Sequence, residues 1–265
     1  MSQQAPSIGG AVGTAEQPRL RWMREVWRST IGKKVIVAVT GIILALYVVA
    51  HMLGNLKAFQ GDGQGAGAAI DGYAEWLRTV GEPAIPRNGA LWMVRAILLA
   101  ALVLHVSAVV QLIRRNRDAR PEGHRDVPVL RRSLASRTMT FTGLLILAFV
   151  IFHVLQFTTR TIHPTPLAGG AVYANVYDAF QEWWLVAIYV IAVGLLGLHL
   201  WHALWSATQT WGADKPNRNP TLRRAAKAVS LAVAIGFAVV PLAFFTGILP
   251  EPESSSQLAS TEADR

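Results

Sequence analysis

The chain contains no cysteine and has few charged residues for its length. Only 15% of its 265 residues are Asp, Glu, Lys or Arg. Without cysteine the chain cannot form disulfides, hold an iron–sulfur cluster through thiolates, or attach a haem covalently through a C-x-x-C-H motif. Because charge is this sparse and 52% of the residues are hydrophobic, the composition also excludes an ordinary soluble domain.

Five long apolar runs fill most of the sequence. Each run reaches the length of about 20 residues that a helix needs to cross a hydrocarbon core of about 30 Å. A backbone inside a bilayer must satisfy its own hydrogen bonds, so each run is expected to be helical. The predicted spans cover approximately residues 34–56, 91–113, 139–159, 184–208 and 228–249. The sequence therefore predicts an all-α integral membrane bundle of five transmembrane helices.

Two polar tails flank this membrane domain, which covers residues 19–249. Residues 1–18 are rich in Gln, Ala, Gly and Ser and lack the apolar core of a secretory signal, so they are expected to be a disordered N-terminal tail. Residues 250–265 form an acidic C-terminal tail. The first apolar run is therefore interpreted as a retained membrane helix.

Basic residues are concentrated on one side of the predicted bundle. The N-terminal flank carries six, the second loop eight and the fourth loop five, which is 19 of the 25 Lys and Arg residues. The positive-inside rule then places the N-terminus in the cytoplasm and the C-terminus outside. The net charge of +9 is explained by these loops, so nucleic-acid binding is not expected.

The first four spans each carry one internal histidine: His51, His105, His153 and His199. A polar residue inside a bilayer is costly enough to suggest a function, and imidazole is an axial ligand of haem iron. Counted from the cytoplasmic helix ends, His51 and His153 lie at about 25 and 24 Å. His105 and His199 lie at about 13 and 18 Å. Matching depth predicts an outer pair, His51 with His153, and an inner pair, His105 with His199.

The other histidines are weaker candidates. His202 competes with His199, because it lies three residues further on almost the same helix face, and depth alone does not decide between them. His124 and His163 fall in loops and are expected to be ordinary polar residues. The fifth span has no histidine and is expected to pack outside the ligand-bearing helices.

A Thr-Gly step occurs in two of the histidine-bearing spans. Thr40-Gly41 and Thr142-Gly143 each precede a histidine, with 11 residues from the threonine to His51 or His153. Eleven residues are about three turns, so threonine and histidine share a face, and glycine would let a flat macrocycle approach the backbone. Small residues also promote helix packing in membranes. The repeated spacing favours the interpretation as part of the outer haem site.

Several motifs resemble the membrane cytochrome b subunit of succinate:quinone oxidoreductases, in its single-subunit, five-helix, two-haem form. The motifs are Gly32-Lys33-Lys34, His51-Met52-Leu53-Gly54-Asn55-Leu56, Phe59-Gln60-Gly61, Tyr73-Ala74-Glu75-Trp76-Leu77-Arg78, Gly81-Glu82-Pro83, Leu91-Trp92-Met93-Val94-Arg95 and His199-Leu200-Trp201-His202. The resemblance covers nearly the whole chain apart from the tails. It implies two b haems, the same two histidine pairs, and His199 as the ligand in preference to His202.

The resemblance also implies partners and a location. They are a flavoprotein subunit that oxidises succinate and an iron–sulfur subunit, both on the cytoplasmic face of a bacterial inner membrane, as in succinate dehydrogenase or fumarate reductase. An oligomer of the whole complex is left open. The residues themselves support an electron path through the lipid bilayer that ends at a quinone, expected to be menaquinone, near the outer haem.

Candidate residues around the quinone and the outer haem follow from their positions. Glu75 and Glu82 precede the second span on the outer side and could protonate a quinone, although solvated loop charges are the ordinary explanation. Arg95, near the outer end of that span, could pair with a propionate of the outer haem or snorkel to the headgroups. Three residues could line an inner quinone site or serve as interfacial anchors: Trp27, Ser29 and Lys33.

Two other functions fit part of the same pattern. One is a b561-like transmembrane haem reductase, which the Gly54-Asn55-Leu56 motif and the cytoplasmic basic loops disfavour. The other is a membrane anchor without haem, which four depth-matched histidines disfavour.

Overall fold

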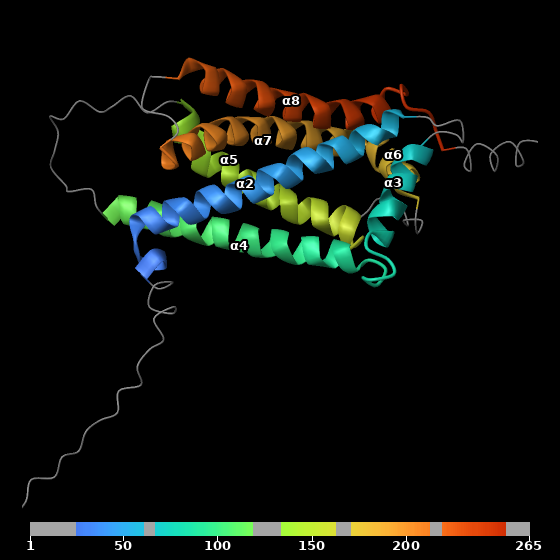
Figure 1. Cartoon of the computed structure of the whole chain (residues 1–265). Coiled ribbons are helices and arrows are strands. Elements are labelled where there is room, and N and C mark those ends of the chain that lie inside the picture. Colours follow the sequence, from blue (N-terminus) through green and yellow to red (C-terminus); the bar gives the residue numbers. More distant parts are fainter. Residues whose placement is uncertain (1–24, 61–66, 119–133, 163–170, 213–218, 253–265) are drawn as a thin grey trace, which may run out of the picture.

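The computed structural model describes residues 25–60, 67–118, 134–162, 171–212 and 219–252 (Figure 1). Within these ranges five helices are long and apolar enough to cross a membrane. They are α2 (Thr30–Asn55), α4 (Gly89–Asp118), α5 (Leu134–His153), α7 (Trp183–Thr210) and α8 (Pro220–Phe245). The described chain is all-helical, which confirms the predicted fold class and a multi-pass membrane protein. The predicted tail 1–18, nearly all of the tail 250–265, and His124 and His163 lie outside the described residues.

The helix ends differ from the predicted spans because capping residues, rather than hydropathy, set them. The Ser29 hydroxyl accepts a hydrogen bond from the Gly32 amide at 2.8 Å and starts α2 four residues before the predicted span. The Asn219 side chain accepts from the Leu222 amide, so α8 begins at Pro220, eight residues early. That helix ends at Phe245, before a glycine with φ of +73°, and not at the predicted residue 249.

Two short helices cover one end of the bundle, and sequence reasoning did not predict them. They are α3 (Ala68–Thr79) and α6 (Val172–Phe180), which pack against each other, and α3 also contacts the 3-10 turn η1 (Leu56–Phe59). The Asp71 carboxylate joins them, because its Oδ1 accepts from the amides of Val172 at 2.6 Å and Tyr173 at 3.0 Å. This end is called the capped end below (Figure 1).

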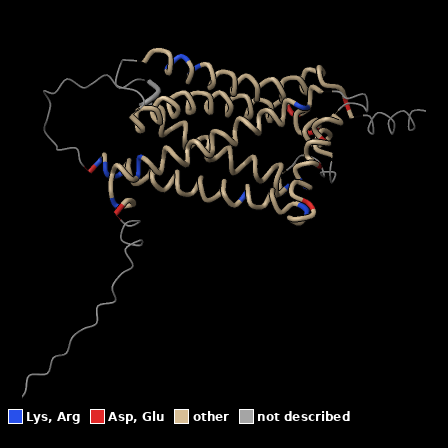
Figure 2. The backbone as a smooth tube through the Cα atoms, in the orientation of Figure 1, with Lys and Arg blue, Asp and Glu red and all other residues tan. Residues whose placement is uncertain are grey.

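Most of the basic residues of three long helices lie at the opposite end of the bundle (Figure 2). These residues are Lys33, Lys34, Arg114, Arg115, Arg117, Arg223, Arg224 and Lys227. Two of them lie over tryptophan rings of α7: Arg223 over Trp205, at 4.0 Å from the ring centroid, and Lys227 over Trp201, at 5.9 Å. This end is called the basic end.

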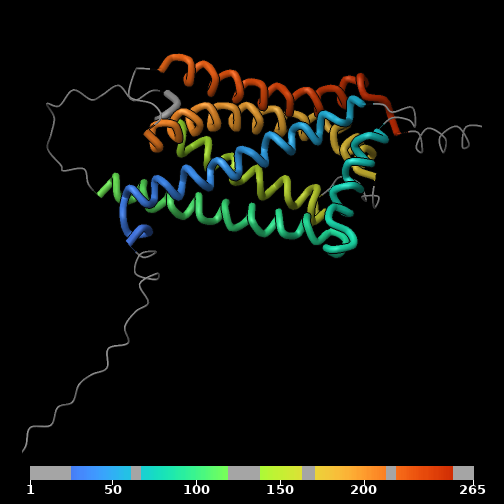
Figure 3. Tube along the Cα trace, in the orientation of Figure 1, coloured from blue at the N-terminus to red at the C-terminus, as the bar shows by residue number. Residues whose placement is uncertain are grey.

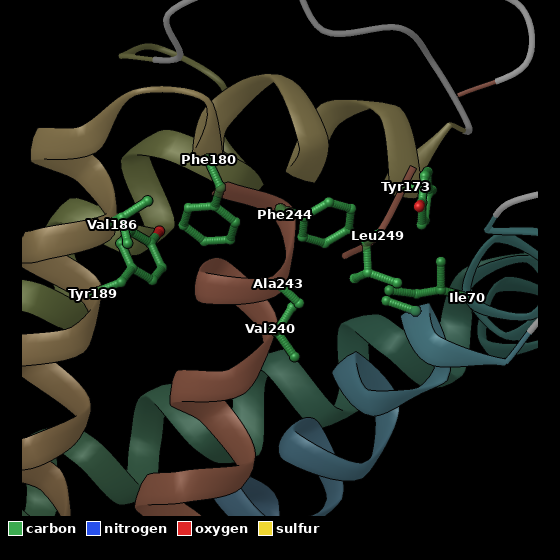
Figure 4. Close-up of a cluster of buried hydrophobic side chains, with 10 residues drawn as sticks. Ile70, Tyr173, Phe180, Val186, Tyr189, Val240, Ala243, Phe244 and Leu249 are labelled. Carbon is green, nitrogen blue, oxygen red and sulfur yellow. The ribbon is translucent and has the colours of Figure 1, made fainter. Parts of the chain in front are cut away.

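The long helices pack as neighbouring pairs. Helix α2 packs on α4, α5 on α7, and α7 on α8, while α2 also contacts α7 and α8 (Figure 3). Helix α8 therefore lies against α7 and α2, outside the helices that carry the four histidines, as the sequence predicted. The largest apolar cluster lies at the capped end, where Phe180, Tyr189 and Phe244 meet Ile70 and Leu249 (Figure 4).

Candidate functional site

The four span histidines come together in the two predicted pairs. His51 of α2 and His153, the last residue of α5, have ring centroids 5.8 Å apart and planes at 74°. His105 of α4 contacts Thr40 of α2, and His199 of α7 contacts Thr142 of α5. The first pair lies toward the capped end, since both residues are near the helix ends that meet α3 and α6, and the second lies nearer the basic end.

A threonine of α2 orients His105 in the basic-end pair. Thr40 Oγ1 lies 3.1 Å from His105 Nδ1 and 2.6 Å from the Ile36 carbonyl. A hydroxyl has one hydrogen, and Thr40 donates it to the carbonyls of its own helix, so its oxygen can accept from His105 when the ring carries its proton on Nδ1. In that tautomer a neutral imidazole keeps a free lone pair on Nε2, as a metal ligand requires.

The same arrangement is repeated between α5 and α7. Thr142 Oγ1 lies 3.4 Å from His199 Nδ1 and donates to the Met139 carbonyl at 3.1 Å. By the same reasoning His199 carries its proton on Nδ1 and leaves Nε2 free. The geometry therefore favours His199 over His202 as a ligand, which depth alone did not decide.

A glycine adjoins each of these threonines and faces the same histidine. A Cβ placed on Gly41 would lie 3.3 Å from His105 Cε1, and one placed on Gly143 would lie 3.3 Å from His199 Cε1. A side chain at either position would crowd the imidazole, so glycine keeps the edge of each ring clear.

These contacts correct the expected role of the Thr-Gly steps. The sequence spacing assigned them to the outer pair, His51 and His153, but they contact the inner pair, His105 and His199. The reason is distance, because 11 residues along a helix span about 16 Å. A threonine therefore reaches the histidine at its own depth on the facing helix and not the one on its own helix.

At the capped end a tyrosine orients His153. His153 Nδ1 lies 3.0 Å from the Tyr189 hydroxyl, which donates to Gln156 Oε1 at 2.8 Å. The hydroxyl hydrogen is used in that bond, so Tyr189 accepts from His153 Nδ1–H and Nε2 is again free. Sequence reasoning missed Tyr189 and Gln156. The only local signal was the three-residue interval from His153 to Gln156, which places them near one face of a helix.

The His51 imidazole packs against aromatic rings. Its imidazole stacks on Tyr47, with centroids 5.5 Å apart and planes at 11°, and lies 5.7 Å from the Phe237 ring of α8. Arg95 of α4 is exposed and lies over Trp92, at 5.0 Å from the ring centroid.

The candidate quinone residues lie at opposite ends. At the basic end, Lys33 Nζ donates to the Trp27 carbonyl and lies 5.8 Å from the Trp27 ring centroid, while Ser29 caps α2 beside them. At the capped end, Glu82 is exposed. Glu75 forms ion pairs with Arg87 and Arg78, and the Arg87 guanidinium holds the pKa of that carboxyl below its usual range. Glu75 therefore stays ionised at neutral pH.

The histidine pair His51 and His153 is a donor set that could hold a cofactor between facing helices. Within the described ranges no group of three or more His, Asp or Glu side chains is clustered to hold a metal ion. Paired histidines with free Nε2 atoms are the axial ligand set of a haem, whose macrocycle supplies the remaining ligands.

No known protein family, curated protein or solved structure matches this chain. Function must therefore be argued from the residues and their geometry.

Proposed function

We propose that the chain is the membrane-anchor, di-haem cytochrome b subunit of a succinate:quinone oxidoreductase. The observation that carries the proposal is the pairing of four intramembrane histidines, with three of the rings hydrogen-bonded at Nδ1 so that Nε2 is free. His105 and His199 would ligate one haem toward the basic end. His51 and His153 would ligate the other toward the capped end.

Each haem, when bound, supplies reversible one-electron chemistry at its iron. The protein residues orient the ligands and shape the surroundings. Thr40, Thr142 and Tyr189 each hold an Nδ1 proton, which fixes the ring orientation and raises the basicity of the ligating nitrogen. Arg95, which lies over Trp92, would supply positive charge to stabilise a propionate carboxylate.

The charge distribution supports a direction for the electrons. The positive-inside rule assigns the basic end to the cytoplasm, where the iron–sulfur and flavoprotein subunits would dock. Electrons would then pass from the basic-end pair to the capped-end pair and on to a quinone near the outer surface. A membrane potential that is positive outside favours this by about 2.3 kcal/mol per 100 mV per charge. That gain would help reduce a low-potential quinone such as menaquinone.

A quinone site at the basic end is the competing location. The contact between Lys33 and Trp27 favours it, because it places a cation and an aromatic ring together at the membrane interface. An uncoupler separates the two locations. Menaquinone reduction by succinate in intact membranes is expected to slow when the potential is dissipated, and an unchanged rate would contradict the capped-end site.

Haem content in the purified complex tests the proposal most directly. We expect two b-type haems per chain by pyridine haemochrome, with one lost in His51→Ala and one in His105→Ala, while the matched control His202→Ala keeps both. A wild-type complex without haem would leave only an anchor. Two haems without co-purifying flavoprotein and iron–sulfur subunits would instead support a transmembrane haem reductase.

A further inference from the structure

Tyr189 links His153 to a buried amide through a two-step hydrogen-bond relay. His153 Nδ1–H donates to the Tyr189 hydroxyl at 3.0 Å, and that hydroxyl donates to Gln156 Oε1 at 2.8 Å. The three side chains come from the end of α5, the N-terminal part of α7 and the π-helix η2 (Val154–Thr158) that continues α5. π-Helical turns are rare and occur frequently at functional sites.

The cost of burying Gln156 indicates what its amide is for. Gln156 is 0% exposed, and its Nε2 has no hydrogen-bond partner among the described residues. A buried donor without a partner is destabilising, so a leucine of similar size would avoid a penalty that glutamine incurs. The one polar contact that the amide does make is its Oε1 bond to Tyr189. Its acceptor oxygen is therefore the feature that explains a glutamine at this position.

The Tyr189 ring is fixed by close aromatic packing. It lies 5.0 Å from the Phe149 ring and 5.0 Å from the Phe180 ring, both edge to face, and 6.2 Å from Phe157. Figure 4 shows Tyr189 beside Phe180 at one side of the capped-end cluster. With the ring held, the hydroxyl stays between His153 and Gln156. Without the Gln156 oxygen, the hydroxyl would no longer donate within this chain of hydrogen bonds and would be a weaker acceptor for His153 Nδ1–H.

The hydrogen-bond relay contacts His153 of the capped-end pair, and it does not include the partner His51. His51, the partner of His153, is held by the rings of Tyr47 and Phe237, and the basic-end histidines each meet a threonine. A perturbation of Tyr189 should therefore affect a single ligand of a single haem.

We propose that Tyr189 and Gln156 are positioning residues that fix the His153 tautomer and lower the redox potential of the capped-end haem. The proposal rests on the proposed function, because it requires a haem at this pair. When the Tyr189 hydroxyl accepts a hydrogen bond from His153 Nδ1–H, the imidazole becomes a stronger electron donor, which stabilises ferric over ferrous iron. Because the Tyr189 hydroxyl is itself a donor to Gln156, it becomes a better acceptor for His153, since hydrogen bonds in a chain strengthen one another.

Redox titration of both haems in the purified whole complex tests this. The variants are Tyr189→Phe, Gln156→Leu and Gln156→Glu, and His51→Ala identifies the signal of the remaining basic-end haem. The matched control is Tyr173→Phe, because Tyr173 also lies at the capped end and its hydroxyl donates to the Pro250 carbonyl at 2.8 Å, not to a histidine.

We expect Tyr189→Phe to raise the potential of the capped-end haem and Gln156→Leu to raise it less, with the basic-end haem unchanged in both. Gln156→Glu keeps an acceptor oxygen and should leave the potential at or below the wild-type value. Tyr173→Phe should move neither haem. If Tyr189→Phe fails to assemble, Gln156→Leu still gives the test, because it leaves the aromatic packing of Tyr189 in place.

The proposal is overturned if neither haem moves, if both move together, or if Tyr173→Phe produces the same shift. These results can be told apart from a failure of the proposed function. If the wild-type complex contains two haems and the substitutions at Tyr189 and Gln156 leave both potentials unchanged, only the positioning role is ruled out. A wild-type complex without haem removes both.

Discussion

At the basic end each histidine meets a threonine from the neighbouring helix, whereas at the capped end one histidine meets a tyrosine and the other meets only aromatic rings. The basic-end contacts repeat between α2 and α4 and between α5 and α7, with the same Thr-Gly step and the same 3.3 Å approach at each glycine. The capped-end contacts do not repeat. His153 is followed by a π-helix, while His51 is followed by about one further turn of α2 and then by the short 3-10 segment η1.

This difference indicates that the two pairs tolerate change differently. In the basic-end pair the two halves are equivalent, so matched substitutions in α2 and α5 should have matched effects. In the capped-end pair the halves are unequal, because the hydrogen-bonded side is His153 alone. Three experiments would break or sharpen this comparison.

The largest expected effect comes from filling the glycine positions. Gly41→Leu and Gly143→Leu should each abolish the basic-end haem, because even a Cβ there lies 3.3 Å from a histidine ring. Haem content should fall to about one per chain in both variants, while the capped-end haem remains.

The control for this pair of variants is Gly194→Leu. Gly194 lies in α7 and nothing would lie within 4 Å of an added Cβ, so both haems should remain. If only one of Gly41→Leu and Gly143→Leu lost a haem, the equivalence of the two halves would be wrong.

A smaller effect is expected from removing the threonine hydroxyls. Thr40→Val and Thr142→Val should each raise the potential of the basic-end haem by about 20–65 mV, the one-electron equivalent of a net hydrogen bond of about 0.5–1.5 kcal/mol. Redox titration checks this, and the capped-end haem serves as the internal reference. Unequal shifts from the two variants would show that the two halves of the basic-end pair are not equivalent. A shift of the capped-end haem would contradict the contacts of Thr40 with His105 and of Thr142 with His199.

The smallest effect is expected at Glu75 on the capped end. Arg87, and then Arg78, hold the pKa of Glu75 below its usual value, so the ion pairs are intact at neutral pH. A lowered carboxyl pKa contributes stability above the unfolded pKa of about 4 and loses it as the pH falls through the folded value. Glu75→Gln should therefore leave quinone reduction unchanged near neutral pH.

Thermal melting against pH provides the measurement for Glu75. The small stability difference between wild type and Glu75→Gln should disappear on acidification. A neutral-range shift in the pH profile of quinone reduction would instead identify Glu75 as a proton donor and contradict the expectation.

The sequence predicted the five spans and the histidine pairs because both depend on length and depth along a helix. Apolar length identifies a span, and a rise of about 1.5 Å per residue gives depth without knowledge of helix rotation. The sequence did not predict helices α3 and α6, because they have 12 and 9 residues and fall in polar loops. Neither helix forms an apolar run long enough to be recognised.

The side-chain partners could not be predicted for a different reason. Which residue faces a histidine depends on the rotation of the neighbouring helix, and a helix that is apolar all round gives no amphipathic pattern to fix that rotation. Tyr189 and Gln156 were therefore missed. For the same reason, the sequence pattern placed Thr40 and Thr142 in the haem site of the histidines on their own helices.

The π-helix after His153 makes this part of the chain sensitive to length. Its widened turn is visible in the bond from the Thr159 amide to the Val154 carbonyl, five residues back, at 2.9 Å. Losing one residue between 154 and 158 would remove the extra residue of the wide turn and restore the α-helical spacing. Such a deletion would hardly alter a hydropathy profile. It would nevertheless change where position 156 lies relative to His153 and Tyr189, so residue number, as well as residue type, is a constraint at this point of the chain.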